Sequence, residues 1–585
     1  MPLVKKRIKK ITDLLGSEQK HILETAFILM LPVILTKITG QLFTLLLASY
    51  YGATDSRLNQ FFIANTIPEL LTTVLMTGAL GTVVIPVLIA SKSKYGKEQF
   101  YRVYSSILNA TIIIFLIVSA LLIVFAGKFV PAAINLVKPD VPPTQAELNN
   151  IANMMRALLF PQLFLGISVF VSSGLNIYDR YIVPQLSPLF YNIGRIIIVV
   201  SFLPLFDYSP WVIVLGAYLG SLLHLLVQLP LFKNLKIKYL PIIDFKDNNL
   251  KEVLKLGLPR ILVLASDQIA LVINNFIAIA FIGGPASFNF AKSLYLVIPS
   301  IFGYTFSYAS YPTLSRLFIE GNQKEIRRIV HKTLNEIFFL ALPFVITLMV
   351  LRVPLVRLVF GIFPNTAFTL DNTYQVAWIL LFFSFGLIFI TARWFVFNLF
   401  YASKNTILPS IVSIFTLTSV IGLSILFTNL LSHNPNYAIS TIDWHYSNFL
   451  SRADEPSRAG VAGISMAMSL VYSIELIIML ILFNRFKIGI KKLATDLSKK
   501  IVAGGWMLVF MYLTFKTWNV ITYIPESADS LYKGSTSLNL FILTTVTVIP
   551  GFMIYYLICK LLRVEELKLL RRYLNPIFKI GGLRI

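Results

Sequence analysis

The sequence has little of what enzymes and secreted proteins use for chemistry or cross-links. Its 585 residues include one cysteine, Cys559, and five scattered histidines. Neither a disulfide within the chain nor a Cys/His zinc site is therefore expected. No cofactor motif is present either, and we expect no metal, no cofactor and no catalytic activity. Charged residues make up only 13% of the chain, whereas soluble domains carry about a quarter.

The chain instead has long apolar runs. Hydrophobic residues make up 56%, and the mean hydropathy is +0.76. A membrane-spanning helix needs about 20 mostly apolar residues, and windows of that size predict about fourteen spans. These spans are centred near residues 38, 75, 115, 165, 195, 221, 270, 301, 343, 387, 418, 471, 508 and 550. We expect an all-α polytopic membrane protein without a separate soluble domain and without a cleavable signal peptide.

The formal net charge of +24 would suggest nucleic acid in a soluble protein, but its distribution does not. The predicted cytoplasmic loops carry roughly four times as many Lys and Arg residues as the loops on the other side. This positive-inside pattern places both termini in the cytoplasm. We therefore expect membrane lipids as neighbours and no nucleic-acid partner.

Two basic linkers divide the predicted spans into sets. We expect a cytoplasmic basic lead, an N-lobe of six helices, a linker, a C-lobe of six helices, and two C-terminal helices with a basic cytoplasmic tail. Their boundaries are 1–20, 21–232, 233–255, 256–484 and 485–585. The longest external loop, 432–458, contains acidic residues and two histidines, and we interpret it as a solvated cap.

The two lobes show weak internal similarity. The second span of the first lobe ends at Pro86 and continues to a polar turn at Gly96. The corresponding span of the second lobe ends at Pro312 and continues to Gly321. Such repeats build two pseudo-symmetric lobes around a midplane site in secondary transporters.

Six cationic side chains fall within predicted spans: Lys37, Arg156, Arg195, Arg260, Lys292 and Arg393. A lysine or arginine at a lipid-facing helix centre costs roughly 2.5 to 3.5 kcal/mol on insertion scales, so these side chains should face protein or water. The candidates for a polar cavity that holds an anionic head group are Lys37, Lys292, Arg260, Asp267 and Glu69. Glu69 could pair with Lys37, and Asp267 could simply neutralise Arg260.

The remaining arginines, Arg156, Arg195 and Arg393, are interpreted as ties between lobes or anchors for lipid phosphates. Breaks and close packing are expected where helices carry proline or glycine. The candidates for hinges and packing are Pro68, Gly40, Gly78, Pro259 and Pro299.

An ordered set of short motifs resembles the MurJ (MviN) family over roughly residues 20 to 490. The residues that carry the resemblance are Thr36-Lys37-Ile38-Thr39-Gly40, Tyr51-Gly52-Ala53, Phe61 to Ala64, Ile67-Pro68-Glu69-Leu70-Leu71, Gly78-Ala79-Leu80, Ile85 to Leu88, Gly174-Leu175-Asn176, Pro184 to Pro188, Asn192, Gln268-Ile269, Ile273-Asn274, Pro312 to Ser315, Phe400-Tyr401-Ala402 and Pro409.

The resemblance implies a fold similar to MATE exporters of the MOP superfamily. It implies a flippase of the bacterial inner membrane that moves lipid II, the undecaprenyl-diphosphate-linked precursor used in peptidoglycan and cell wall biogenesis, by alternating access. We expect such a transporter to act as a monomer. The family's arginine in the first helix is matched by Lys37. Other charged positions of the family fall on Phe43, Asn59, Thr72 and Ser293, and Lys292 is one place off.

Two alternatives stay open on the sequence. One is a flippase for another polyprenyl-diphosphate glycan or a MATE-type exporter, although a drug exporter would need buried carboxylates for a cationic cargo. The other is a membrane glycosyltransferase, which would need a carboxylate pair in an external loop. The buried cations favour an anionic cargo, and the resemblance implies that this cargo is lipid II.

Overall fold

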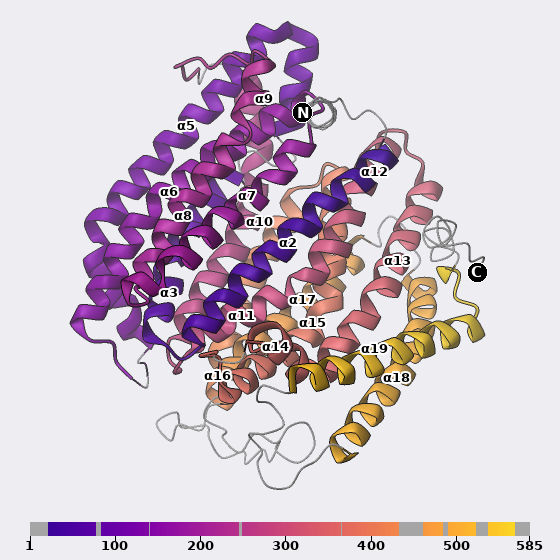
Figure 1. Cartoon of the computed structure of the whole chain (residues 1–585). Coiled ribbons are helices and arrows are strands. Elements are labelled where there is room, and N and C mark those ends of the chain that lie inside the picture. Colours follow the sequence, from indigo (N-terminus) through magenta and orange to yellow (C-terminus); the bar gives the residue numbers. More distant parts are fainter. Residues whose placement is uncertain are drawn as a thin grey trace, which may run out of the picture. The chain divides into compact units, whose positions relative to one another are not determined.

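The computed structural model describes residues 22–77, 84–137, 139, 141–244, 248–363, 366–431, 460–483, 490–521 and 536–567. The basic lead 1–20, Gly78 and the external loop 432–458 lie outside these residues. The side chains of Pro259 and Arg260 also lie outside the described part. The described residues form helices and connecting turns, with no strand among them (Figure 1), so the expected all-α architecture is confirmed.

The chain forms two compact units. Unit 1 comprises residues 1–289 and 406–421, and unit 2 comprises 290–405 and 422–585. Helices α11 and α16 each contribute to both units. The sequence predicts two lobes separated by the linker 233–255, and this division remains a prediction.

The helices of unit 1 begin near the N-terminus and end within α11. They are α2 (Ile22–Tyr51), α3 (Ser56–Leu71), η1 (Thr72–Thr77), α5 (Val84–Val137), α6 (Gln145–Ile177), α7 (Ile182–Phe202), η2 (Pro204–Phe206), α8 (Pro210–Leu226), α9 (Leu229–Asn234), α10 (Asn248–Ala278) and α11 (Gly284–Tyr295).

The helices of unit 2 follow in chain order. They are η3 (Pro299–Tyr304), α12 (Thr305–Ile319), α13 (Gln323–Val350), α14 (Arg352–Phe360), α15 (Leu370–Ala402), α16 (Ile407–Leu431), α17 (Ala462–Phe483), α18 (Ile490–Ile521) and α19 (Thr536–Leu561).

Twelve helices in the described part of the chain are long and apolar enough to cross a membrane. Each coincides with one of the predicted spans. The predicted spans near residues 75 and 301 are missing from this set because their helices are interrupted. The first consists of α3, η1 and the start of α5, and the second consists of α11, η3 and α12.

Both interruptions are π-helical turns close to a proline. Thr72–Thr77 follows one turn after Pro68, and Pro299–Tyr304 begins at Pro299. Proline removes a backbone donor, and its ring clashes with the carbonyl one turn earlier. π-Helical turns are rare and occur frequently at functional sites. Each of these two predicted spans thus contains a π-helical turn near a proline.

Two glycines mark the ends of these broken helices. Gly96 has φ 84° and Gly321 has φ 69°, a left-handed backbone that costs other residues strain. Gly96 kinks α5, which joins the end of the second span to the whole of the third. The two polar turns that the sequence shows at Gly96 and Gly321 therefore share a left-handed glycine.

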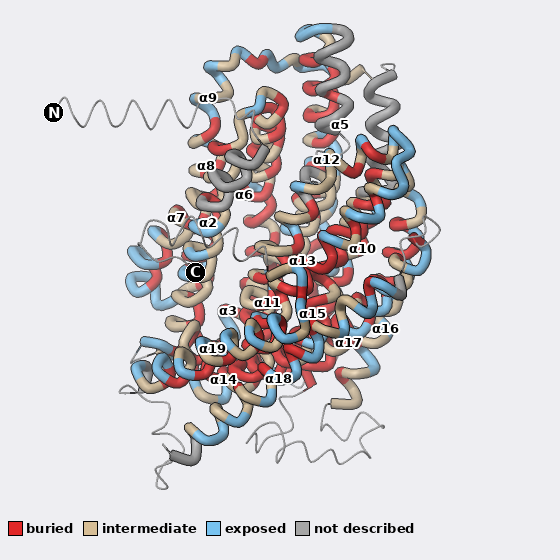
Figure 2. The backbone as a smooth tube through the Cα atoms, turned by 90° about the vertical axis from the view of Figure 1, so that its right-hand side faces the viewer, coloured by how far each residue is buried: buried red, intermediate tan, exposed pale blue. Residues whose placement is uncertain are grey.

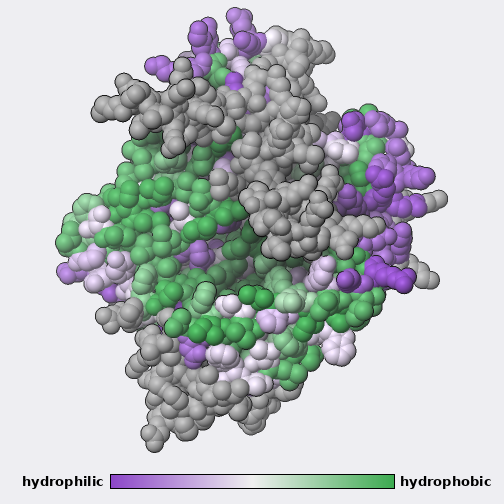
Figure 3. Space-filling model, turned by 45° about the vertical axis from the view of Figure 1, so that its right-hand side comes forward, coloured by the Kyte–Doolittle hydropathy of each residue, from purple (hydrophilic) through white to green (hydrophobic). Residues whose placement is uncertain are grey.

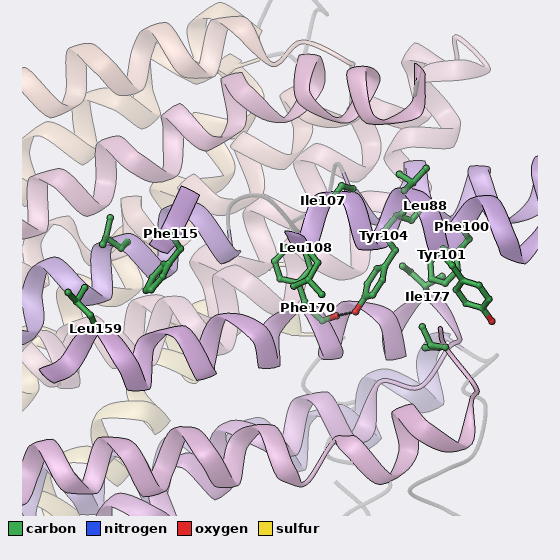
Figure 4. Close-up of a cluster of buried hydrophobic side chains, with 13 residues drawn as sticks. Leu88, Phe100, Tyr101, Tyr104, Ile107, Leu108, Phe115, Leu159, Phe170 and Ile177 are labelled. Carbon is green, nitrogen blue, oxygen red and sulfur yellow. Dashed lines mark hydrogen bonds between the residues drawn. The ribbon is translucent and has the colours of Figure 1, made fainter. Parts of the chain in front are cut away.

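The core of unit 1 between α5 and α6 is aromatic. Phe100, Tyr104 and Phe170 are almost fully buried, and Figure 4 shows side chains of α5 directed toward α6. The Tyr104 hydroxyl donates a hydrogen bond of 2.8 Å to the Phe170 carbonyl oxygen. That bond satisfies the Tyr104 hydroxyl in a cluster that apolar burial otherwise stabilises.

In unit 2, α15 is buried along most of its length (Figure 2). The C-terminal helices attach through a buried polar contact. Lys500 Nζ on α18 donates to Asn335 Oδ1 on α13 at 2.6 Å and pairs with Glu566 at 3.2 Å. Lys500 is 1% exposed, and breaking such a buried pair is strongly destabilising.

The surface carries many exposed large apolar side chains. In Figure 3 the face toward the viewer has broad apolar areas, and hydrophilic side chains gather mainly at its margins. Apolar patches of this extent are untypical of soluble monomers. Together with the twelve apolar helices, they identify a multi-pass membrane protein.

Candidate functional site

Helix α2 carries its exposed apolar side chains on one side. Those side chains are Ile34, Leu35, Ile38 and Leu42. With about 3.6 residues per turn, Lys37 projects roughly a third of a turn away from their mean direction. Lys37 is half-buried. It therefore lies off the apolar stripe that would face lipid, as the cost of a lipid-facing lysine requires.

A second side of α2 packs against α7. Asn192 Nδ2 on α7 donates to the Thr36 carbonyl oxygen at 3.1 Å and to Thr39 Oγ1 at 3.3 Å. Gly40 lies at the same contact, where an added Cβ would be 3.3 Å from Asn192 Nδ2. This joint fixes the register of the two helices and thereby the direction of Lys37.

The polar groups around Lys37 are poorly satisfied by the protein. No hydrogen bond or ion pair joins the Lys37 ammonium to any residue that the structure describes. One turn further along α2, Gln41 Nε2 is buried without a partner among the described residues, and Thr36 Oγ1 is in the same state. Buried polar groups are nearly always paired with protein or ordered water. This side of α2 thus presents hydrogen-bonding capacity to something other than the described protein.

Arg195 on α7 lies next to the same joint. Its guanidinium carbon is 3.5 Å from the centroid of the Phe43 ring on α2 and 5.0 Å from the centroid of the Tyr191 ring. No described residue accepts a hydrogen bond from it. Cation–π stacking stabilises the charge on its face and leaves the N–H groups at the edge available.

Glu69 adds a carboxylate from α3. It is exposed, and Asn65 Nδ2 donates to its Oε2 at 3.0 Å. Its charge also attracts Arg195. The structure records no ion pair between Glu69 and Lys37, although it describes both side chains. Sequence reasoning had considered that pair but had not connected Glu69 with Arg195.

The other candidate residues are spread over the chain. Asp267 is half-buried on α10 in unit 1, and Lys292 is half-buried on α11 in unit 2. Both make further polar interactions. Pro68 and Pro299 are buried at the π-helical breaks. Arg260, Pro259 and Gly78 fall outside the described side chains, so their predicted roles remain predictions.

Arg156 and Arg393 are engaged within their own units. Arg156 Nε donates to the Ile123 carbonyl oxygen at 2.8 Å, and its NH1 donates to Asn153 Oδ1 at 2.6 Å. Arg393 Nε pairs with Glu475 at 2.6 Å, and the two side chains are 5% and 1% exposed. These arginines tie α5 to α6 and α15 to α17. Their predicted roles as ties between lobes or anchors for lipid phosphates remain predictions.

Among the described residues, no group of three histidine, cysteine, aspartate or glutamate side chains could hold a metal ion. Helices α2 and α7 contribute the cations Lys37 and Arg195 to this region, and α3 contributes the carboxylate of Glu69. Sequence reasoning assigned Arg195 a tie or lipid-anchor role. The signal it could have used is the pair Asn192 and Arg195, which lie three residues apart on one side of α7.

Comparison with known proteins gives a consistent result. Residues 47–441 match a family described as "Lipid II flippase MurJ". The chain is 28% identical over 395 residues to a protein of Buchnera aphidicola subsp. Acyrthosiphon pisum named "Probable lipid II flippase MurJ", covering 66% of this chain and 74% of that protein. A protein of Thermotoga maritima with the same name is 27% identical over 545 residues, covering 92% and 96%.

Solved structures extend the match to the fold. The structure titled "Lipid II flippase MurJ, inward closed conformation" superimposes with a TM-score of 0.65 at 20% identity, covering 91% of this chain and 99% of that chain. An inward-facing multidrug resistance MATE family transporter of the MOP superfamily has a TM-score of 0.57 at 14% identity, covering 80% and 99%. The expected similarity to MATE transporters is confirmed at the level of the fold.

Proposed function

This chain belongs to the MurJ family of lipid II flippases, and on that premise we propose that it moves lipid II across the bacterial inner membrane. The cargo carries a diphosphate between its polyprenyl tail and its sugar head group. That group must leave water to cross the bilayer, so cationic donors have to replace its lost hydration. The proposal includes both termini in the cytoplasm and alternating access between two lobes.

The observation that carries this proposal is the state of Lys37. Its ammonium lies on the interior side of a spanning helix and has no partner in the described part of the chain. A lysine binds phosphate as a point charge and imposes little orientation, which suits a group that must be released on the opposite side. Lys292 is proposed as the cation that unit 2 contributes, with Arg260 near the cytoplasmic entrance. Asp267 is proposed to balance Arg260.

The buried carboxylates already have cationic neighbours within the protein, which disfavours a cationic cargo. Among the described residues, Glu336 and Glu475 are the buried acids. Glu475 is paired with Arg393 at 2.6 Å, and Glu336 lies 3.8 Å from Lys332. Neither is free to bind a cationic drug, so the MATE-type fold here is proposed to serve an anionic cargo.

The test replaces Lys37 with alanine in a strain depleted of its own lipid II flippase. We expect K37A to insert at the normal level and to lose complementation, with lipid II accumulating in the cells. K37R should restore growth at least in part, because it keeps the charge. The matched control is K128A, which removes an exposed lysine from α5 and should complement normally.

Normal growth with K37A would contradict the proposed role of Lys37. Accumulation of a different lipid-linked glycan in cells that lack this protein would instead identify another polyprenyl-diphosphate cargo for the same cavity.

A further inference from the structure

Three arginines with described side chains lie deep within spanning helices, and they differ in what surrounds them. The N–H groups of Arg156 donate to a backbone carbonyl and to Asn153. Those of Arg393 donate to Glu475. The guanidinium of Arg195 lies against the rings of Phe43 and Tyr191, and no described residue accepts a hydrogen bond from it.

The stacking fixes how Arg195 can act. A guanidinium that lies 3.5 Å from the centroid of an aromatic ring is held by its planar face. The ring accepts no in-plane hydrogen bond, so the donors at the edge of the fork stay available. That fork matches the spacing of two phosphate oxygens and can bind them with two parallel hydrogen bonds.

The position of Arg195 on α7 also directs it away from lipid. The exposed apolar residues at this level of the helix are Ile197 and Val200, and Arg195 projects roughly half a turn from their mean direction. Glu69, which attracts Arg195 from α3, is itself exposed rather than buried. Because a carboxylate in lipid is costly, we expect water rather than lipid beside this exposed group.

We propose that Arg195 is a second anion-binding residue of unit 1 and that it orients one phosphoryl group of a lipid-linked diphosphate. Phe43 holds the Arg195 guanidinium in place. Lys37 lies six residues before Phe43 on α2 and supplies a second positive charge, which orients the phosphate less than the guanidinium does. The inference rests on the proposed function and adds a residue and a geometry to it. It predicts a preference for two phosphoryl groups over one.

The experiment measures binding to the purified full-length protein in detergent. The probes are farnesyl diphosphate and farnesyl monophosphate. We expect the wild-type chain to bind the diphosphate more tightly and R195Q to weaken that binding about tenfold, which is the loss of one charge-assisted bidentate contact. Binding of the monophosphate should change less. R195K should recover only part of the loss, because an ammonium has no planar fork.

The matched control is R156Q, which removes an arginine that only ties helices. It should lower the melting temperature and leave the preference for diphosphate intact. In a rescue variant, F43R is combined with R195Q, so that an arginine on α2 replaces the aromatic ring next to position 195. This variant should restore binding of farnesyl diphosphate. A structural role for Arg195 predicts no such rescue.

A folded R195Q protein that binds the diphosphate within twofold of wild type would overturn the proposal. If R195Q does not fold, the folded double variant decides, and failure of F43R to restore binding overturns it as well. Equal affinity of the wild-type chain for both probes would instead contradict a diphosphate cargo. That result concerns the proposed function and is visible without any variant.

Discussion

At the scale of single residues, the same side-chain type has different roles in different surroundings. Arg393 forms an ion pair with Glu475 at 2.6 Å. Lys500 donates a hydrogen bond to Asn335 and forms an ion pair with Glu566. Lys37 and Arg195 keep their hydrogen-bond donors unused by the described protein. A buried charge with a partner serves packing, whereas a charge without one in a spanning helix indicates a ligand.

Replacing Glu69 is expected to strengthen diphosphate binding, whereas replacing Lys37 or Arg195 is expected to weaken it. Its negative charge acts on Arg195 and would repel an incoming diphosphate. E69Q should therefore strengthen binding of farnesyl diphosphate about two- to threefold, a small effect because the group is solvated. The measurement is the same equilibrium titration, with E98Q as the control, since Glu98 is an exposed glutamate on α5.

Weaker binding by E69Q would show that Glu69 instead orders Arg195. In that case its attraction for the guanidinium would outweigh its repulsion of the ligand.

Sequence alone could locate Lys37, because a lysine within an apolar span is unusual whatever surrounds it. It could not separate Arg195 from Arg393. Their difference depends on contacts with Phe43 and with Glu475, which lie far away along the chain. Helix periodicity gives the side of a helix on which a residue lies, but not the partner that occupies the opposite position.

At the scale of elements, the second helix of each repeat differs from its neighbours. In the described part of the chain, π-helical turns occur in α3–η1 and α11–η3–α12, one in each, and not in the other spans. A π-helical turn leaves irregular backbone hydrogen bonding, and in a membrane such backbone is tolerated where protein or water surrounds it. These two elements are the candidates for bending during transport.

Gly303 allows a test of the break in unit 2. A Cβ added to Gly303 would lie 2.5 Å from the Thr391 carbonyl oxygen on α15, so η3 and α15 would have to separate. We expect G303A to cost about 1–3 kcal/mol of stability and to lower the melting temperature in detergent. G422A is the control, because a Cβ at Gly422 on α16 meets nothing within 4 Å.

An unchanged melting temperature for G303A would mean that η3 shifts freely against α15. The close approach would then not hold the broken helix in place.

The prolines let the sequence predict where these helices are interrupted, and apolar windows predicted the other twelve spans. The form of the interruption was not predictable. Pro68 lies inside α3, and the π-helical turn η1 begins one turn after it. Pro299, by contrast, is the first residue of the π-helical turn η3. Proline sets a local constraint, and the neighbouring helices determine how the backbone accommodates it.

At the scale of the whole molecule, the chain combines two compact units with a similar broken helix in each. Unit 1 contains the half-buried Lys37 and Arg195 and the exposed Glu69. Unit 2 contains Lys292, and its buried Lys500 joins α18 to Asn335 on α13 and to Glu566 after α19. Composition alone predicted the membrane class, because apolar content and span length need no tertiary contact. The division into units 1 and 2 was not predicted, because it depends on contacts between distant helices.

The central claim is that Lys37 faces water and an anionic cargo. The direct measurement compares cysteines at adjacent positions, K37C and I38C, in a C559S background that removes the native buried thiol. Ile38 is 59% exposed on the apolar side of α2, so lipid should cover it. Modification by a water-soluble sulfonatoethyl methanethiosulfonate requires the thiolate, which lipid suppresses. We predict that K37C reacts at least about tenfold faster than I38C and that added lipid II protects it. Equal rates at both positions, or faster reaction of I38C, would contradict the account.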